Sequence, residues 1–243
     1  MSDFSRLLIL ACATSLIVAA DAKGPDEKWP AHSMERPRPP IVTPAPAGAP
    51  VPAPADAIAL FDGKDLSLWK QQKAKEGEDD TARWKLTEDY MEVVSGTGQH
   101  VCRKKLVGDI QLHLEWATPK EVKGKGQGRG NSGIFIEGFP EVQVLDSFDN
   151  DTYPDGQAGG LYGQYPPLVN ACRPPGEWQT YDIIIERAIE KDGEMVRKAR
   201  LTVIHNGVAF KQDANLIIVP PKERYPCKTM EIRSAIEIFG IAL

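Results

Sequence analysis

The sequence lacks the features that mark several large classes of protein. It has no excess of basic charge, since 29 lysine and arginine residues face 34 aspartate and glutamate residues, for a net charge of −5. Nucleic-acid binding requires a basic surface for the phosphates, so this balance argues against it. The apolar residues make up 42% of the chain, which is enough for a folded core and excludes wholesale disorder.

The chain also lacks an apolar run long enough to span a membrane near its start. Leu7 to Ala20 is a run of fourteen residues, whereas a spanning helix needs roughly 20. It follows a weakly basic stretch and ends in small side chains, which is typical of a secretory signal. We predict a signal peptide over residues 1–22 and export to the periplasm or beyond the cell. Cys12 lies too early in the run to favour a lipoprotein anchor.

Cysteine is scarce, with four residues in the chain. No CxxC spacing is present, so the sequence predicts no zinc site. Removal of the signal leaves Cys102, Cys172 and Cys227 in an oxidising compartment, where an odd number cannot pair completely. A disulfide between Cys102 and Cys172 and a set of free thiols both remain open.

A complete phosphate-binding motif is missing as well. Residues 123–133 (KGKGQGRGNSG) are rich in glycine but lack the GK[ST] ending of a P-loop. A strand-like segment follows them, where a phosphate site would need the N-terminus of a helix. We therefore set nucleotide binding aside and expect a flexible, basic loop at the rim of the fold, where loops often border ligand sites.

Proline is concentrated in one segment. Ten of the 20 prolines fall between Pro25 and Pro54, where the sequence reads RPRPPIVTPAPAGAPVPAPA. Such a segment favours the polyproline II conformation and behaves as a semi-stiff spacer. We predict a disordered linker over residues 23–55 and one folded domain over residues 56–243.

The predicted domain shows the periodicity of β-strands. Asp109 to Ala117 (DIQLHLEWA) alternates apolar and polar residues, which is typical of a strand with one buried face. Asn206-Gly207 directly after a strand predicts a tight hairpin. Further strands are expected at 90–94, 132–136, 142–145, 181–186 and 199–205. Many short strands joined by turns predict an all-β jelly-roll sandwich of two antiparallel sheets.

Six short strings between Leu60 and Val208 occur in the order found in one protein family. They are LFDGKDLSLW, NSGIF, EVQVLD, GGLYG, GEWQTYD and TVIHNG. On these strings the chain resembles the 3-keto-disaccharide hydrolase domain family. The resemblance implies a concanavalin A-like jelly roll, similar to laminarinase-type glycoside hydrolases, in an exported bacterial protein that acts on sugars oxidised at C3.

The end of the chain departs from the family pattern. A segment of the type LQDHG, followed by a strand such as VRFRNIW, is expected after the hairpin, and neither occurs from Pro220 onward. Either another segment replaces the last strand, or the reading frame has slipped near Val219 and the tail is foreign to the fold. A missing late strand would open an edge of the sandwich and expose its core, so an inactive family member is one alternative.

The EVQVLD string carries the main catalytic candidates. In a strand, Glu141 and Gln143 share one face, and the valines beside them face the core. Asp146 falls on the valine side unless a bulge intervenes, and bulges are common beside active sites. The spacing ExQxxD resembles the ExDxxE arrangement of laminarinase-type enzymes. Gln143 replaces the middle acid, which weakens a retaining mechanism that needs two close carboxylates.

A 3-keto sugar permits another route. A base removes the C2 proton, the C1 substituent leaves, and water adds back. This route needs a base, an acid at the glycosidic oxygen and donors for the enolate oxygen. We predict Glu141 or His205 as the base and Asp146 as the acid. The predicted sugar-binding donors are Asn131, Gln143 and Tyr162.

Other polar groups have two interpretations each. Glu115 shares the polar face of its strand with His113, and it is either a reserve acid or base in the sugar site or a partner in a cross-strand salt bridge to arginine or lysine. Asp149, Asp151 and Asp155 could hold a structural calcium ion, but their spacing lacks the EF-hand pattern and favours a solvated group of charges. The sequence requires no cofactor.

Together these features predict an exported hydrolase that cleaves 3-keto-glycosides or 3-keto-disaccharides and takes an oxidised sugar as its substrate. The same sandwich also serves lectins, so a non-catalytic carbohydrate-binding module is the alternative.

Overall fold

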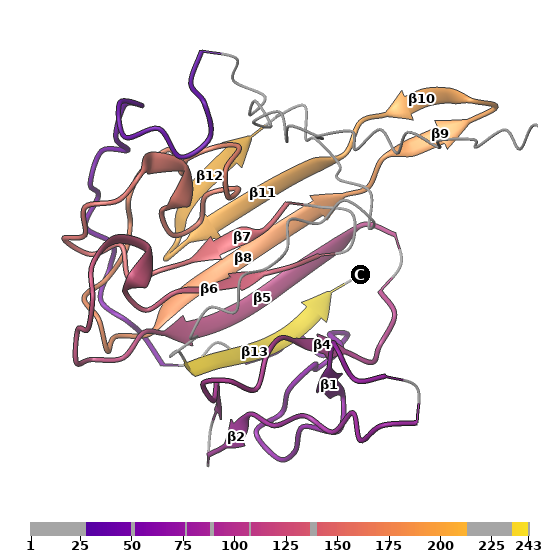
Figure 1. Ribbon diagram of the computed structural model, residues 1–243. Helices are drawn as coiled ribbons and strands as arrows, with labels where there is room; N and C mark the ends of the chain where they lie inside the picture. Colours follow the sequence, from indigo (N-terminus) through magenta and orange to yellow (C-terminus); the bar gives the residue numbers. More distant parts are fainter. Residues whose placement is uncertain are drawn as a thin grey trace, which may run out of the picture.

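Figure 1 shows the computed structural model of the chain, which describes residues 28–49, 52–75, 77–87, 90–106, 108–136, 140–212 and 235–242. The predicted signal peptide and Cys227 lie outside these residues. The elements are β1 (Trp69–Gln71), β2 (Lys85–Leu86), β3 (Met91–Glu92), β4 (His100–Cys102), β5 (Ile110–Ala117), η1 (Gly126–Gly128), β6 (Ser132–Ile134), β7 (Val142–Val144), η2 (Pro154–Gly156), β8 (Gln179–Glu186), β9 (Ile189–Lys191), β10 (Glu194–Arg197), β11 (Arg200–His205), β12 (Val208–Gln212) and β13 (Ala235–Ala242). The all-β prediction is therefore confirmed.

A seven-stranded antiparallel sheet dominates the described structure, in the order β12-β11-β8-β5-β13-β3-β2. Its β5 strand alternates between buried and more exposed residues from Ile110 to Leu114, as the sequence predicts, whereas Glu115 is buried like its apolar neighbours. Leu112 lies opposite Ile183 and Leu114 opposite Tyr181, and all four side chains are buried. Residues opposite each other share a face of the sheet, so these pairs form one wall of the core.

The paired strands β6 and β7 form a second layer against this wall. Val142 and Val144 of β7 are fully buried in the same cluster as Leu114 and Ile183. The Tyr181 hydroxyl donates a 2.7 Å hydrogen bond to the main-chain carbonyl of Gln143, which joins the two layers. In Figure 1, β6 and β7 accordingly overlap the part of the sheet formed by β5 and β8. The structure is thus a sandwich of antiparallel sheets, while the jelly-roll order of its connections stays a prediction.

The predicted hairpin at Asn206-Gly207 joins β11 and β12, with His205 opposite Val208. Both turn residues have positive φ angles, 53° for Asn206 and 76° for Gly207. A two-residue turn of this kind matches the twist of the flanking strands, and asparagine and glycine tolerate its left-handed backbone. The prediction of a hairpin is confirmed.

The tail contributes a strand to the interior of the large sheet. β13 pairs with β5 along its length and with β3 at its start, and Figure 1 shows it beside β5. A register shift between Phe239 and Ile241 places Gly240 at a bulge, which a strand tolerates. Of the two alternatives for the tail, the structure supports the replacement of the last strand.

The proline-rich segment differs from the spacer that its composition predicts. Residues 28–49 lie against the domain, and the main chains of Pro40 and Val42 exchange hydrogen bonds with Asn170 at 2.9 and 3.0 Å. The Arg173 side chain donates to the Ala45 carbonyl at 2.9 Å. Proline lacks a main-chain N–H but keeps its carbonyl group, which can accept a hydrogen bond from a neighbouring surface. The proline content of the segment therefore does not predict its docking on the domain.

Cys102 and Cys172 are both free thiols, so the disulfide alternative is not realised. Burial raises the pKa of the Cys172 thiol to about 12, which makes it an unreactive core residue. In the described part of the chain, no helix has the length and apolar character that crossing a membrane requires.

Candidate active site

The candidate site lies on the face of β6 and β7 that points away from the core. Gly133 of β6 is directly opposite Gln143 of β7, and Glu141 shares their face because it is two residues from Gln143. The β6–β7 pairing shows no register shift. The alternation of Glu141 and Gln143 with the buried valines therefore follows the pattern that the sequence predicts.

Glu141 places its carboxyl group over Gly133. A Cβ atom at Gly133 would lie 1.9 Å from Glu141 Oε1, so only glycine leaves room for the carboxyl there. The carboxyl is partly buried and has no hydrogen bond or ion pair with any residue that the structure describes. Burial raises its pKa from 4.5 to about 7. A carboxyl group with this pKa can both take and return a proton near neutral pH.

Two tyrosine hydroxyls lie beside Glu141. The Tyr162 main-chain N–H donates to the Glu141 carbonyl at 2.9 Å, which fixes the two residues side by side. The Tyr162 and Tyr153 hydroxyls are hydrogen-bonded to each other at 2.5 Å. Burial raises the pKa of both phenols, with further contributions from the negative charges of Glu141 and Asp155. Both hydroxyls therefore keep their protons at neutral pH and can serve as donors.

A cluster of amide side chains supports the same face. The Gln143 amide donates to Gln127 Oε1 at 2.8 Å, and the Asn131 amide donates to the Gln127 carbonyl and Oε1 at 2.8 and 3.2 Å. Gln127 itself donates to Thr152 and Gly156. The glycine-rich segment that contains Gln127 is thus an ordered wall and not the flexible loop that its composition predicts. Asn131 makes two amide hydrogen bonds to this wall, and Gln143 uses one of its two amide hydrogens there.

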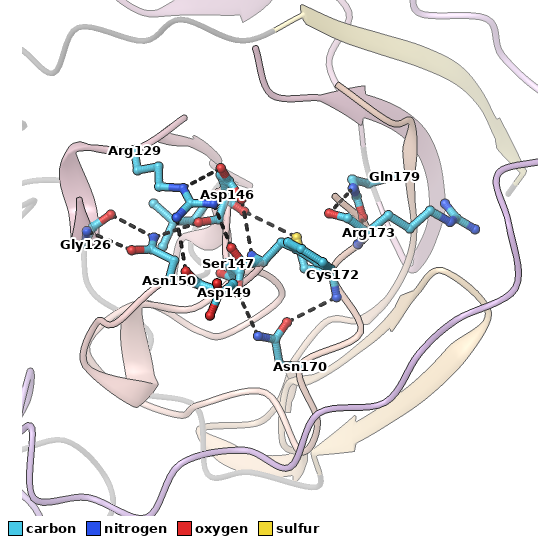
Figure 2. Close-up of polar contacts among 12 residues, drawn as sticks. Gly126, Arg129, Asp146, Ser147, Asp149, Asn150, Asn170, Cys172, Arg173 and Gln179 are labelled. Atoms are coloured by element: carbon cyan, nitrogen blue, oxygen red, sulfur yellow. Dashed lines mark hydrogen bonds and ion pairs between the residues drawn. The ribbon is translucent and has the colours of Figure 1, made fainter. Parts of the chain in front are cut away.

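Asp146 lies at the other end of β7 from Glu141. Its Oδ2 atom accepts a 2.6 Å hydrogen bond from Arg129 Nε within a buried ion pair, and its Oδ1 accepts from the Phe148 N–H at 3.2 Å. Figure 2 shows Asp146 beside Arg129 and Asn150. The structure does not bring Asp146 next to Glu141, because the chain between them runs along the strand.

His205 points into the core between the two layers. It is 5% exposed, and its ring packs on Trp116 and Tyr181 at centroid distances of 5.8 and 4.9 Å. Its Nε2 atom lies 3.3 Å from Gln179 Oε1. Burial lowers its pKa to about 3. The structure therefore separates His205 from Glu141, which faces the opposite way.

Glu115 and His113 lie on the outer face of the large sheet, on the side of the sandwich away from Glu141. His113 Nδ1 lies 2.5 Å from Asp182 Oδ1 on the neighbouring strand, and His113 Nε2 lies 3.8 Å from Glu115 Oε1. The hydrogen bond to Asp182 raises the His113 pKa. His113 thus has acidic neighbours on its own strand and on the adjacent one.

The aspartates that were considered for calcium take separate partners. Asp151 pairs with Arg38 at 2.5 Å on the surface, while the fully buried Asp155 accepts the His32 N–H at 2.9 Å. Among the described residues, no group of three histidine, cysteine, aspartate or glutamate side chains is arranged to hold a metal ion.

Sequence reasoning missed Tyr153, Gln127 and His32. The His32 ring lies against Tyr153 and Tyr162, at centroid distances of 4.5 and 4.9 Å. A signal for His32 was present, because the KWPAHSMER stretch is chemically varied whereas the sequence after it is simple. The proline count of the whole segment obscured this difference.

The fold and the site define a two-layered all-β protein whose acid–base groups lie on the outer face of the smaller layer. The chain belongs to the family of 3-keto-alpha-glucoside-1,2-lyase-like domains, whose family model matches residues 56–219. The resemblance found in the sequence is thereby confirmed.

The chain also resembles several solved structures to different degrees. A crystal structure of a "putative glycosyl hydrolase" from Parabacteroides distasonis ATCC 8503 is 37% identical, with a TM-score of 0.63, and the match covers 84% of this chain and 89% of that one. A second protein so described from the same organism is 18% identical with a TM-score of 0.47, covering 76% and 89% of the two chains. Alginate lyase Aly36B is 14% identical with a TM-score of 0.39, covering 65% and 82%. No curated protein matches the chain.

Proposed function

We propose that this protein is an exported carbohydrate-active enzyme that cleaves the glycosidic bond of 3-keto-glycosides or 3-keto-disaccharides. The observation that carries the proposal is the Glu141 carboxyl group, which is partly buried, unpaired among the described residues, and has a pKa of about 7. Strongly shifted ionisable groups are typical of catalytic sites. Membership of the lyase-like family supports the substrate class, and the "putative glycosyl hydrolase" of P. distasonis supports a glycoside as the target.

Glu141 is the proposed base in preference to His205. A ketone at C3 acidifies the C2 proton, and a carboxylate with a pKa near 7 removes it more readily than an ordinary one. His205 is enclosed between the layers and, with a pKa of about 3, is a weak base. The predicted acid role of Asp146 has little support, because its carboxylate is engaged by Arg129.

The tyrosine pair is the proposed stabiliser of the enolate oxygen. In the bond between Tyr153 and Tyr162, one hydroxyl donates and the other keeps its own proton. This second proton is free to donate outward to developing negative charge at C3. Removing one such donor typically costs roughly 10²–10³ in rate.

The two-carboxylate mechanism of ordinary retaining glycosidases fits this site poorly. That mechanism needs carboxyl groups about 5–5.5 Å apart. Gln143 stands where the middle acid would be, and Asp146 is at the far end of β7 in an ion pair. Elimination followed by hydration needs only one carboxylate, so we propose this route within a concanavalin A-like jelly roll.

The test is turnover of a 3-keto-disaccharide by the wild type and by Glu141→Gln. We expect the wild type to release the second sugar and the variant to be slower by roughly 10²–10⁴. Glu190→Gln is the matched control, because Glu190 is an exposed carboxylate on β9 of the projecting β9–β10 hairpin (Figure 1). Absence of turnover by folded wild-type protein, with binding that survives Glu141→Gln, would instead identify a binding module.

A further inference from the structure

The proline-rich segment brings a histidine to the candidate active site. His32 is exposed, and its ring lies 4.5 and 4.9 Å from the rings of Tyr153 and Tyr162. Its ring nitrogens make no hydrogen bond with any residue that the structure describes. A Cβ atom at Gly163 would lie 3.3 Å from His32 Nε2, so the glycine keeps the space at this nitrogen open. Glu141 and His32 therefore border the same pair of tyrosines.

The main chain holds His32 in this position. Its φ angle is 64°, which is uncommon for a residue other than glycine and occurs mainly where the surroundings require it. The His32 N–H donates to Asp155 Oδ2 at 2.9 Å. Arg36, four residues along, lies 3.9 Å from the same oxygen and donates to the Gln164 carbonyl at 3.1 Å. Buried groups of the domain thus anchor both ends of this short stretch.

The proposed reaction lacks a proton donor for the leaving group. Asp146 is occupied by Arg129, and the tyrosine phenols have raised pKa values because of burial and nearby negative charge. The tyrosines are thus suited to donate hydrogen bonds and poorly suited to release protons. Glu141 takes up the C2 proton and cannot donate at the same time.

We propose that His32 is the catalytic acid that protonates the departing glycosidic oxygen, which makes the proline-rich segment part of the active site. This inference rests on the proposed function. The residue lies outside the matched family region of 56–219, so the inference is drawn from the contacts of this chain and not from the family match.

The proton and electron movements balance. Glu141 takes the C2 proton, and the C–H electron pair forms the C2=C3 bond of an enolate. The C3 carbonyl then reforms, and the electron pair of the C2=C3 bond moves to form the C1=C2 bond. The C1–O bond breaks, and its electron pair stays on the leaving oxygen. Protonated His32 gives that oxygen its proton. During hydration, neutral His32 takes a proton from water as the oxygen adds to C1, and Glu141 returns a proton to C2.

The test compares two aglycones in the full-length protein. A sugar aglycone would leave as a strongly basic alkoxide, so its departure needs an acid that protonates the oxygen. Nitrophenolate is a weak base and leaves without a proton. His32→Asn keeps a residue that tolerates the left-handed backbone, and His32→Phe keeps an aromatic ring against the tyrosines. We expect both variants to lose roughly 10²–10⁴ in kcat on a 3-keto-disaccharide and less than about tenfold on a nitrophenyl 3-keto-glucoside. Met34→Ala, an exposed residue of the same segment, is the control and should behave as wild type.

The outcomes separate the two proposals. Equal losses on both substrates, or wild-type behaviour of His32→Phe, would overturn the role of His32 as an acid while leaving the proposed function intact. Failure of the wild type to turn over either substrate would overturn the proposed function and this inference with it. Thermal melts of each variant confirm that the losses do not come from unfolding.

Discussion

At the scale of single residues, partners decide which carboxylates are reactive. Glu141 and Asp146 come from one string of the sequence, yet Asp146 is neutralised by Arg129 at 2.6 Å and Glu141 has no described partner. A carboxylate that is buried without a partner is destabilised relative to its protonated form. The protein therefore carries Glu141 at a cost in stability, which is common at catalytic positions.

We expect Glu141→Gln to stabilise the protein at high pH and not at low pH. The pKa of Glu141 rises from 4.5 to about 7 on folding, so the folded state holds this proton more tightly than the unfolded state. The wild type then loses stability as pH rises from 4.5 to about 7 and keeps the full penalty above that. One pKa unit is about 1.4 kcal/mol, and partial exposure reduces the effect, so about 1–3 kcal/mol is expected.

Denaturant unfolding at pH 4 and pH 8 measures this difference. The two proteins should nearly converge at pH 4, where the carboxyl is protonated in the folded state and largely protonated in the unfolded state. A gap between them that is the same at both pH values would contradict the raised pKa.

At the scale of elements, the β11–β12 turn combines a backbone role with a side-chain role. The buried Asn206 accepts hydrogen bonds at Oδ1 from Arg173 Nη1 at 2.6 Å and from the Thr180 N–H at 2.8 Å. Its amide donates to the Ala171 carbonyl and to Gln179 Oε1. The turn is therefore bonded to the segments before and within β8, beyond its contribution to the hairpin.

Two substitutions separate these roles. Asn206→Gly keeps the left-handed backbone and deletes the side-chain bonds, one of them to a buried guanidinium, so we expect a loss of about 2–4 kcal/mol. Gly207→Ala deletes no bond, and its Cβ would meet no atom within 4 Å. The free energy of unfolding should fall by only about 1–2 kcal/mol, because alanine is strained at the positive φ angle of this position. A loss in Asn206→Gly no larger than that in Gly207→Ala, measured by denaturant unfolding, would contradict the expected contribution of the Asn206 side-chain bonds.

At the scale of the whole molecule, segments far apart in sequence complete the domain from both ends. Residues 28–49 dock beside Asn170 and Asp155, and β13 joins the large sheet between β5 and β3. Both segments lie outside residues 56–219, which the family model matches. A strand in the interior of a sheet pairs on both sides, so its loss would leave β5 with an unpaired edge.

Removal of the last strand should therefore unfold the domain. A chain that ends at residue 234 lacks all of β13, whereas one that ends at residue 242 keeps it. We expect the shorter chain to lose its cooperative thermal transition, because the missing pairing is large relative to a typical net stability of about 5–15 kcal/mol. The longer chain should melt like the wild type. Similar melting of both truncated chains would show that the tail is foreign to the fold.

The local features of this protein followed from its sequence alone. Alternation in DIQLHLEWA, the Asn-Gly turn and the shared face of Glu141 and Gln143 depend on neighbours in the chain, and the structure has all three. The family could also be identified from the sequence, because six short motifs occur in the order that is typical of it, and the family model confirms it. These features arise from strand geometry and backbone preferences, which act over a few residues.

Only the tertiary structure decided which polar groups meet. It placed Arg129 on Asp146, enclosed His205 between two layers, set Tyr153 against Tyr162 and brought His32 to them from the proline-rich segment. Each of these contacts joins residues from separate segments, and the spacing of apolar and polar residues along the chain cannot predict such contacts. Desolvation and ion pairing depend on atoms packed from other segments, so the reactivity of a carboxylate is a property of the folded chain.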